Sequence, residues 1–368
     1  MTWQTIKLGE LARVRTGKLD ANASDENGLY PFFTCAVEPL SINTPAFDCK
    51  AILVAGNGDL NVKYYEGKFN AYQRTYVIES LDEKILLPKY LYLFLNEYVN
   101  ELRTLAIGGV IKYIKLANLT DAPIPLPPLA EQQRIAAILE KAELIKRKRK
   151  LAIEKLDKVA KSIFIEMFGE PKFNPFKWEY KKLSELVSKL GDGLHGTPKY
   201  NDDGDYYFIN GNNLHHGVIK TNSSTKKVDF DEFTKHKREL NNTTMIVSIN
   251  GTLGKVAFYN DEKIILGKSA CYFNVKESLI NKTYLFHLLE SQYFMDYALN
   301  MATGSTIKNV SLKSMRNFPI PLPPLDLQEK FCNLMNRIGT IKVKLNEGLS
   351  KQSKLFISLQ NQAFYGQL

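Results

Sequence analysis

The sequence is poor in residues that bind metals or carry redox chemistry. Its 368 residues include four cysteines and five histidines. The cysteines form no CxxC motif, and no histidine stands at zinc-ligand spacing beside them. His215 and His216 are adjacent, so on a strand they would point to opposite faces and could not share a ligand. We therefore expect no metal site, and cysteines that are reduced and packed.

Long apolar runs are also missing. No window reaches the roughly eighteen uncharged apolar residues that a membrane span needs. The first 17 residues lack the apolar block of a signal peptide. These absences predict a cytoplasmic protein without a membrane partner. The composition, 44% hydrophobic and 24% charged, is ordinary for a globular protein, and the length suits two domains with additional helices.

Signatures of catalysis are absent as well. An adenine methyltransferase should carry an N/D-P-P-Y/F loop for its flipped base, and the nearest string, Asn174-Pro175-Phe176, is one proline short. There is no G-x-x-x-x-G-K-S/T phosphate loop and no G-x-S-x-G nucleophile elbow. The D-E-K strings at Asp82 and Asp261 lack the third acidic partner of a nuclease site. The sequence predicts binding without catalysis and without a cofactor.

One heptapeptide occurs twice. PIPLPPL runs from 123 to 129 and again from 319 to 325, 196 positions later. Upstream of it, GGVIKYIKLANL aligns with GSTIKNVSLKSM, and each copy opens with W-x4-L-x-E-L, at Trp3 and at Trp178. The chain is therefore interpreted as a tandem duplication. The aligned pairs include Gly108 with Gly304, Ile111 with Ile307, Lys112 with Lys308 and Leu116 with Leu312.

The segments between these shared ends differ in sequence. The first interior predicts strands at 51–56, 62–65 and 74–79, with glycine and asparagine between them. The second predicts a hairpin over 245–259 followed by a strand at 270–275. Different middles inside shared ends predict an α+β protein whose two β-rich modules each recognise something different.

A long helix is predicted after each PIPLPPL. The prolines, with φ fixed and no N–H, force an extended entry and cannot themselves be part of that helix. Apolar positions then alternate at spacings of three and four, which is typical of a coiled coil. We expect the two helices, each about 60 Å long, to pair antiparallel and to relate the modules by a pseudo-twofold axis. Antiparallel pairing would also place the two weakly apolar layers, Arg149 with Ala152 and Gly348 with Gln352, near one another, where Arg149 could reach a polar partner. The expected contact positions are 135, 138, 142, 145, 149, 152, 156, 159 and 163, then 331, 334, 338, 341, 345, 348, 352, 355 and 359.

The charge balance favours an anionic partner. The net charge is +10 with a pI near 9.1, which is compatible with nucleic acid and also with a merely basic surface. Residues 1–128 carry 13 basic and 14 acidic side chains, whereas residues 171–324 carry 20 and 15. A spacer between two dissimilar modules fits duplex DNA, whose half-sites repeat along one face. We expect the first module to bind DNA weakly by itself.

Several strings resemble one protein family. PIPLPPLAEQQRIAAIL with the later SIFIEMFGE resembles the central conserved region of the specificity (S) subunit of Type I restriction-modification systems, and PIPLPPLDLQEKF resembles its distal counterpart. GKFNAYQRTYVI, DGLHGTPKYND and INGTLGKVAF are similar to segments of that family's target recognition domains. The resemblance covers essentially the whole chain. The corresponding division is 1–128 and 171–324 as recognition domains, with 129–170 and 325–368 as helices.

The resemblance implies a subunit without chemistry of its own. Each recognition domain would read one half of a gapped site in double-stranded DNA, and the helices would set the gap. Two methyltransferase (M) subunits, which methylate adenine from S-adenosylmethionine, would dock on the helices, and restriction (R) subunits would join them. Partner docking is expected at Glu131, Gln132 and Gln328, although the second copy lacks the Glu of the first.

DNA-reading residues are expected where side chains can bond base edges or phosphates. Lys112 and Lys308, at matching positions, are interpreted as phosphate contacts. Tyr72 fits core packing equally well, and the Asn-Gly pairs fit ordinary turns. The basic run 146–150 is interpreted as a solvated or partner-facing helix surface. The other candidates are Asn57, Lys63, Tyr64, Gln73 and Arg74 in the first module, and His195, Thr197, Lys199, Tyr200, Asn212, Asn213, Asn250, Thr252 and Lys255 in the second.

Two other functions remain open on the sequence. One is an adaptor whose modules bind proteins, which salt-insensitive binding without DNA preference would favour. The other is a specificity module of a different methyltransferase-based defence complex, which neighbouring genes would reveal.

Overall fold

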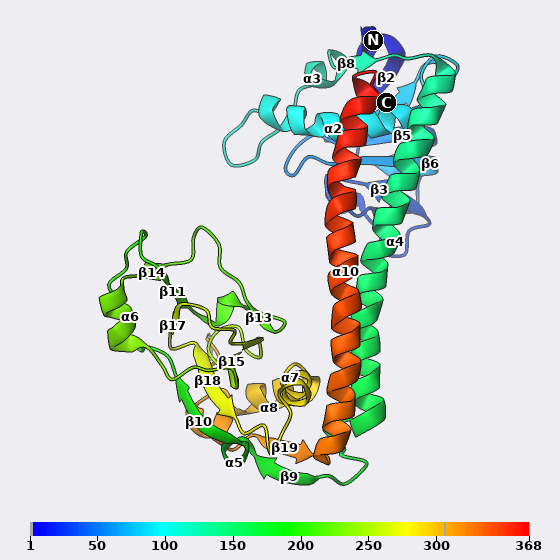
Figure 1. Ribbon diagram of the computed structural model, residues 1–368. Helices are drawn as coiled ribbons and strands as arrows, with labels where there is room; N and C mark the ends of the chain where they lie inside the picture. The colour runs from blue at the N-terminus through cyan, green and yellow to red at the C-terminus, as the bar shows by residue number, and fades with distance from the viewer. Residues whose placement is uncertain (1–2, 305–306, 368) are drawn as a thin grey trace. The chain divides into compact units, whose positions relative to one another are not determined.

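A computed structural model describes residues 3–304 and 307–367 (Figure 1). The chain divides into two compact units, each mixing helices and strands. Unit 1 comprises Met1–Leu151 with Leu345–Leu368, and unit 2 comprises Ala152–Lys344. The expected α+β class is confirmed. Ser305 and Thr306, which the repeat aligns with Gly109 and Val110, lie outside the described residues.

Unit 1 is built on a six-stranded sheet with the order β2-β7-β5-β6-β3-β4. The strand pairs are antiparallel except β3 with β6. Residues 51–55 of the central strand β5 are buried because both faces of the sheet are covered. Helix α2 (Pro88–Leu105) covers one face, and Phe33 and Phe69 pack on the other. The strands are β2 (Ala12–Thr16), β3 (Tyr30–Phe33), β4 (Leu40–Ile42), β5 (Phe47–Ala55), β6 (Val62–Ala71) and β7 (Thr75–Ser80).

Short elements close unit 1 around the proline motif. Strand β8 (Pro123–Pro125) pairs antiparallel with β1 (Thr5–Lys7), an edge position that proline tolerates because only some backbone groups there need partners. The buried Tyr90 donates its hydroxyl hydrogen to the Pro125 carbonyl at 2.8 Å, which anchors this strand to α2. The remaining elements are α1 (Leu8–Leu11), the 3-10 helix η1 (Ala21–Ala23) and α3 (Leu116–Thr120).

Unit 2 contains a four-stranded antiparallel sheet with the order β10-β18-β15-β16. A second sheet, β14-β11-β17, and the pairs β12-β13 and β19-β9 complete its strands. Its strands are β9 (Glu179–Lys182), β10 (Val187–Asp192), β11 (Tyr206–Ile209), β12 (Leu214–His215), β13 (Val218–Ile219), β14 (Lys227–Val228), β15 (Thr244–Ser248), β16 (Val256–Phe258), β17 (Ile264–Leu266), β18 (Ala270–Val275) and β19 (Pro319–Leu322). Its helices are α5 (Leu183–Leu186), η2 (Gly211–Asn213), α6 (Phe230–His236), α7 (Lys282–Leu289), α8 (Gln292–Met301) and α9 (Leu312–Arg316).

The two units share more than their ends. The sheet order β2-β7-β5-β6 of unit 1 is matched by β10-β18-β15-β16 of unit 2, with antiparallel pairing throughout. The indole nitrogens of Trp3 and Trp178 both donate to a carbonyl near the end of a long helix, at Ala363 and at Phe168. The middles, which differ in sequence, therefore share a sheet, because a fold retains strand pairing after its side chains have diverged.

Helices α4 (Leu129–Phe168) and α10 (Leu325–Phe364) follow the two proline motifs, as predicted. In unit 1, Lys146 lies over the Phe356 ring, and a Cβ added at Gly348 would overlap the Arg149 guanidinium. In unit 2, the Lys342 ammonium donates to the Asp157 carboxylate, and the ring centroids of Phe164 and Phe331 lie 5.6 Å apart. Within each unit, the residue number of the contact on α10 falls as the residue number on α4 rises. The expected antiparallel pairing is confirmed, and the two weakly apolar layers meet where Arg149 lies against Gly348.

The contact face of these helices is displaced from the expected one. Five residues expected between the helices are instead exposed: Ile145 by 41%, Val159 by 45%, Leu334 by 37%, Ile341 by 48% and Leu355 by 57%. The following residue in each case is more buried, so the expected register is wrong at these five positions. Both helices shift in the same direction. The residues that take these places are Lys146, Ala160, Met335, Lys342 and Phe356.

Candidate functional site

One edge of the unit 1 sheet collects several predicted DNA-reading residues. Strand β5 ends there and passes into the Gly56-Asn57-Gly58 turn, while the turn before β7 carries Gln73 and Arg74. The Gly56 amide donates to the Arg74 carbonyl at 2.7 Å, and the Gly58 amide donates to the Lys112 carbonyl at 2.9 Å. These backbone bonds hold three separate segments side by side. We call Asn57, Gln73, Arg74 and Lys112 edge 1.

Two edge 1 residues, Gln73 and Arg74, line a small open pocket. The pocket has a volume of about 280 Å³ and is lined by Thr16, Gly56, Gln73, Arg74, Tyr76 and Ile114. The Tyr76 hydroxyl donates to the Ile114 carbonyl at 3.1 Å, and burial raises its pKa, so it stays neutral. Among the described residues, no side chain bonds or pairs with the Arg74 guanidinium. The Tyr76 side chain is therefore fixed against Ile114, whereas the Arg74 guanidinium can bind an external group.

Three predicted residues of unit 1 have other surroundings. Lys63 is half-buried, bonds the Asn61 side chain, and has a pKa lowered by desolvation. Tyr64 packs on Tyr92 of α2 with ring centroids 6.1 Å apart. Tyr72 is partly buried, and its amide donates to the Phe33 carbonyl at 2.9 Å. Among the described residues, none of these three side chains bonds an edge 1 side chain.

Unit 2 forms a matching edge where β15 ends. The Gly251 amide donates to the Lys308 carbonyl at 3.0 Å, and the Asn250 side chain donates to that of Asn309 at 3.1 Å. The Thr252 hydroxyl donates to the Asn212 side chain at 3.4 Å. Asn212, Asn250, Thr252 and Lys308 therefore come together, as Asn57 and Lys112 do in unit 1.

The matching edge reveals a candidate that the sequence reading missed. The Ile249 amide donates to the Ser269 carbonyl at 2.9 Å, just as Gly56 donates to Arg74. Lys268 and Ser269 thus occupy the backbone positions of Gln73 and Arg74. The Ser269 hydroxyl is bonded within the unit to Gly211 and Asn210, whereas Lys268 is exposed. We call Asn212, Asn250, Thr252, Lys268 and Lys308 edge 2.

A sequence signal for Lys268 exists but is faint. In both units an Asn-Gly turn follows one central strand, β5 or β15. A basic residue, Arg74 or Lys268, stands in the turn before the strand that pairs with it, β7 or β18. The intervening lengths differ, and the residues around them do not match. Only the backbone bonds establish that the two turns are equivalent.

Other predicted residues of unit 2 lie in turns that are already bonded internally. His195 pairs with Asp192 at 2.6 Å, and the Lys199 amide donates to Glu232 at 3.0 Å, which lowers the pKa of that carboxyl. Asn213 uses both ends of its side-chain amide, accepting from Asn210 and donating to Lys220. The described contacts do not bring these side chains into edge 2. The same holds for Thr197, Tyr200, whose ring lies 5.8 Å from that of Phe208, and Lys255, whose amide donates to Ser248.

Two residues expected to dock a partner are instead internal. Gln132 is fully buried, accepts from the Leu87 amide at 2.9 Å, and donates to the carbonyls of Ile85 and Pro127. Gln328 is also fully buried, accepting from the Asn281 amide and donating to the Pro323 carbonyl. The docking expectation is wrong for both side chains, because the polar atoms of each are hydrogen-bonded within the unit and join a long helix to its module. Glu131 is partly exposed and pairs with Arg134 at 2.9 Å.

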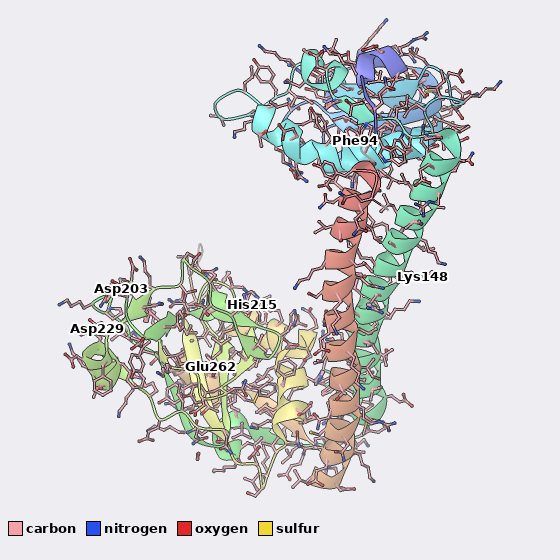
Figure 2. All side chains as sticks on the ribbon, turned by 45° about the horizontal axis from the view of Figure 1, so that its top comes forward. Phe94, Lys148, Asp203, His215, Asp229 and Glu262 are labelled. Atoms are coloured by element: carbon pink, nitrogen blue, oxygen red, sulfur yellow. The ribbon has the colours of Figure 1, made fainter. Side chains whose placement is uncertain are left out.

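The basic run 146–150 lies on α4. Arg147, Lys148 and Lys150 are exposed, and the side chain of Lys148 projects away from the helix (Figure 2). Lys146 and Arg149 are partly buried against α10 in unit 1. The run therefore divides into a solvated face and a face that covers the partner helix.

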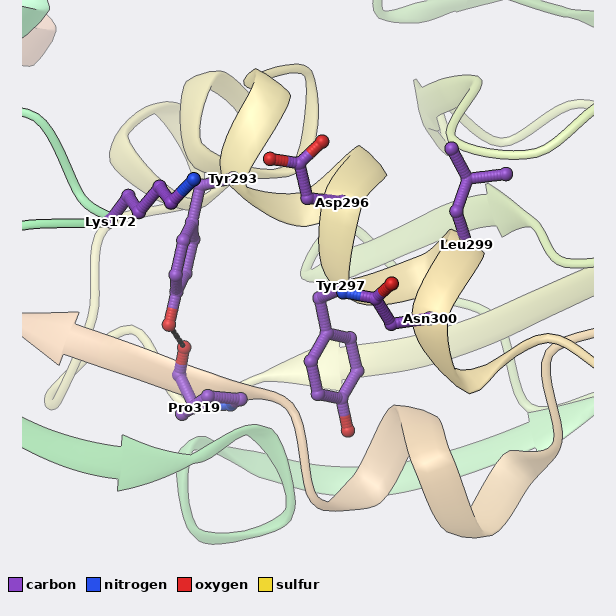
Figure 3. A pocket seen from close by; sticks show the side chains of 7 residues that line it. All are labelled: Lys172, Tyr293, Asp296, Tyr297, Leu299, Asn300 and Pro319. Carbon is purple, nitrogen blue, oxygen red and sulfur yellow. Dashed lines mark hydrogen bonds between the residues drawn. The ribbon is translucent and has the colours of Figure 1, made fainter.

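A larger pocket lies in unit 2, and three of its polar side chains are bonded within the unit. It has a volume of about 390 Å³ and lies beside β19 (Figure 3). Its two tyrosines are already bonded, Tyr293 donating to the Pro319 carbonyl at 2.9 Å and Tyr297 to that of Ser314 at 2.8 Å. Asp296 accepts from Gln292 at 2.7 Å. These bonds support the wall of the module, and Lys172 and Asn300 also line the pocket.

The described residues hold no group of three or more His, Cys, Asp or Glu side chains arranged for a metal ion. All four cysteines are free, and Cys271 is buried. In residues 3–304 and 307–367, no helix combines the length and apolar character needed to cross a membrane.

Comparison with known proteins agrees with the duplicated architecture. The family described as Type I restriction modification DNA specificity domain matches residues 1–155 and 175–354. The Type I restriction enzyme EcoDI specificity subunit of Escherichia coli is 29% identical, covering 100% of this chain and 88% of that protein. The Type I restriction enzyme MjaVIII specificity subunit of Methanocaldococcus jannaschii is 24% identical, covering 97% and 91%.

A solved structure shares the fold. The crystal structure of the Type-I restriction-modification system S subunit from M. genitalium matches with a TM-score of 0.63 at 16% identity, covering 99% of this chain and 96% of that one. The family match extends over both units and confirms the resemblance seen in the proline motifs. The chain therefore belongs to the family of Type I restriction-modification DNA specificity proteins.

Proposed function

We propose that this chain is the DNA-specificity subunit of a Type I restriction-modification complex and carries out no catalysis itself. Edge 1 reads one half of a two-part DNA site, and edge 2 reads the other half. The observation that carries this proposal is that both edges use the same backbone frame but differ in one turn, which carries Gln73 and Arg74 in unit 1 and Lys268 and Ser269 in unit 2. A common frame with variable readers is what two unlike half-sites require.

The chemistry of the two edges supports DNA as the ligand. Arginine and lysine bond the acceptors of guanine, and asparagine and glutamine bond adenine. Gln73 and Arg74 lie in the turn before β7 of unit 1, and Lys268 lies in the equivalent turn before β18 of unit 2. We call these two turns the reading turns. Lys112 and Lys308 are the same residue type at the same backbone position. We assign these two lysines to phosphate contacts, which do not depend on sequence.

The long helices are proposed to set the gap and to hold the methyltransferase subunits. Ile145, Val159, Ile341 and Leu355 offer exposed apolar surface on these helices, where Gln132 and Gln328 offer none. Because 159 and 355, like 145 and 341, are 196 residues apart, the exposed positions repeat with the duplication. This repetition favours two copies of one partner. Restriction subunits would join through those methyltransferase subunits, and the complex would act in the cytoplasm.

The experiment that tests the proposal is single-molecule methylation sequencing. Cells expressing this chain with its adjacent methyltransferase are compared with cells lacking the chain. We expect a new adenine-methylated motif of two short sequences with a fixed gap. An assembled complex that produces no new motif would contradict the proposal and favour an adaptor that binds proteins.

A further inference from the structure

Two exposed apolar side chains lie on one short loop beside edge 1. Val110 is 104% exposed and Ile111 is 62% exposed. Ile107 and Tyr113 close the loop by exchanging backbone bonds of 3.0 and 2.8 Å. Single exposed apolar residues are common on protein surfaces and need no function. What calls for an explanation is the recurrence of this loop.

Unit 2 carries the same loop at the same repeat position. Thr303 and Asn309 exchange two backbone bonds of 2.9 Å, and Ile307 is 61% exposed. The aligned glycines, Gly108 and Gly304, have φ of +116° and +91°, and a Cβ at either would meet the carbonyl oxygen of the following isoleucine. Sequence and backbone together therefore preserve a glycine, an exposed isoleucine and a lysine in both units. We call these segments twin loop 1 (107–113) and twin loop 2 (303–304 and 307–309).

Each twin loop is fastened to its reading edge. The carbonyls of Lys112 and Lys308 accept from Gly58 and Gly251, the glycines of the two Asn-Gly turns. The residue after each closure continues this attachment, since Ile114 donates to the Gly56 carbonyl at 2.9 Å and Val310 to that of Ile249 at 2.8 Å. A ligand that reaches Asn57 or Asn250 would therefore meet the loop beside it.

We propose that Ile111 and Ile307 make apolar contacts to the minor groove of the duplex at the two half-sites. This inference rests on the proposed DNA-reading function. The lysine beside each isoleucine supplies the charge complementarity for a phosphate, which an apolar protein surface would not need. DNA therefore fits the loops better than a partner subunit does.

The minor groove follows from the duplication. The two half-sites differ in sequence, so a contact common to both units must use a feature common to all sequences. The thymine methyl group in the major groove is sequence-dependent. Deoxyribose and the faces of base steps are present in every sequence, and apolar side chains reach them from the minor groove. The twin loops would thus contribute affinity and orientation, and the reading turns would contribute sequence preference.

The test uses Ile111→Ser and Ile307→Ser in the complete complex with its methyltransferase subunits. The probe is a duplex carrying the two-part site found by methylation sequencing. Leu81→Ser is the matched control, because Leu81 is 57% exposed and follows the far end of β7 from Arg74. We expect each isoleucine variant to weaken binding by about tenfold to hundredfold, the range for burying an aliphatic side chain.

Two further readouts identify the contact. Ile111→Ser should leave the salt dependence unchanged, whereas Lys112→Ala should reduce the slope of log K against log salt by about one. Hydroxyl-radical cleavage reports exposure of deoxyribose, so Ile111→Ser should remove protection at one half-site and Ile307→Ser at the other.

The outcomes separate this inference from the proposed function. If the wild-type complex prefers its two-part site and Ile111→Ser binds as tightly as Leu81→Ser, the minor-groove contact is refuted and the DNA-reading function stands. If native mass spectrometry shows that Ile111→Ser loses a methyltransferase subunit, the loop is a partner contact and the inference is also refuted. A wild-type complex without any site preference would refute the proposed function itself.

Discussion

Replacing Arg74 with alanine should weaken recognition of one half-site and leave the other intact. Arg74 is exposed, its backbone is held by the 2.7 Å bond from Gly56, and its guanidinium has no bonding partner among the described residues. Its removal should therefore leave the fold unchanged. The consequence should appear in the affinity for DNA and not in the free energy of unfolding.

The size of the effect follows from the chemistry of arginine. A two-bond contact to guanine contributes about 1 to 3 kcal/mol of discrimination, which corresponds to about 5- to 150-fold in affinity. If Arg74 contacted only a phosphate, binding would weaken equally for all sequences and the salt slope would fall by about one. The two roles therefore predict different dependences on sequence and on salt.

The assay is equilibrium binding of the assembled complex to duplexes in which one half-site at a time is altered. Lys84→Ala is the matched control, because it removes the same charge beyond the far end of β7. Lys268→Ala should give the mirror result and affect only the other half-site. Equal loss at both half-sites, or a loss no larger than that of Lys84→Ala, would refute the assignment of Arg74 to a single reading edge.

Three other changes test the frame that holds the edges. Inserting or deleting one heptad in α4 or α10 should alter the gap or disrupt assembly while the half-sites persist in methylation sequencing; altered half-sites would contradict the spacer role. Gln132→Ala should destabilise unit 1 by about 1 to 3 kcal/mol in denaturant unfolding, because it leaves the Leu87 amide without its buried partner, and the exposed Gln133→Ala should have little effect. Burial lowers the pKa of His287 from 6.5 to about 4. The unfolded chain therefore protonates this imidazole more readily than the folded chain does, and the free energy of unfolding falls as the pH drops from 6.5 to about 4. The contribution is about 3 kcal/mol by pH 4, and wild type and His287→Gln should differ in pH dependence there; parallel curves would be inconsistent with a buried neutral imidazole.

The sequence by itself determined the features that are local or repeated. The two PIPLPPL motifs, the helices after them and the approach of Arg149 to Gly348 follow from proline geometry and apolar spacing. A 3-4 period specifies that two helices pack, and the duplication specifies that they do so in the same way. Lys112 and Lys308 could also be paired from the alignment alone.

The tertiary structure decided which of two neighbouring residues faces the partner helix. Val159 precedes Ala160 and Leu355 precedes Phe356, so either member of each pair could satisfy an apolar spacing of three or four. The sequence offers both faces, and only the packing of one helix on the other selects between them. The unselected Val159 and Leu355 remain exposed, and that surface is available for a partner.

The tertiary structure also decided which residues share an edge. Gln132 reads as a polar surface residue on a helix, yet the bonds that bury it come from Ile85 and Leu87, 47 and 45 residues away. The equivalence of Lys268 with Gln73 rests on backbone hydrogen bonds and leaves only a faint signal in the sequence. Long-range pairing brings such groups together, because a backbone bond constrains position without constraining the side chain. The sequence therefore named the side chains of both edges except Lys268, but it could not show which candidates share an edge and which lie elsewhere.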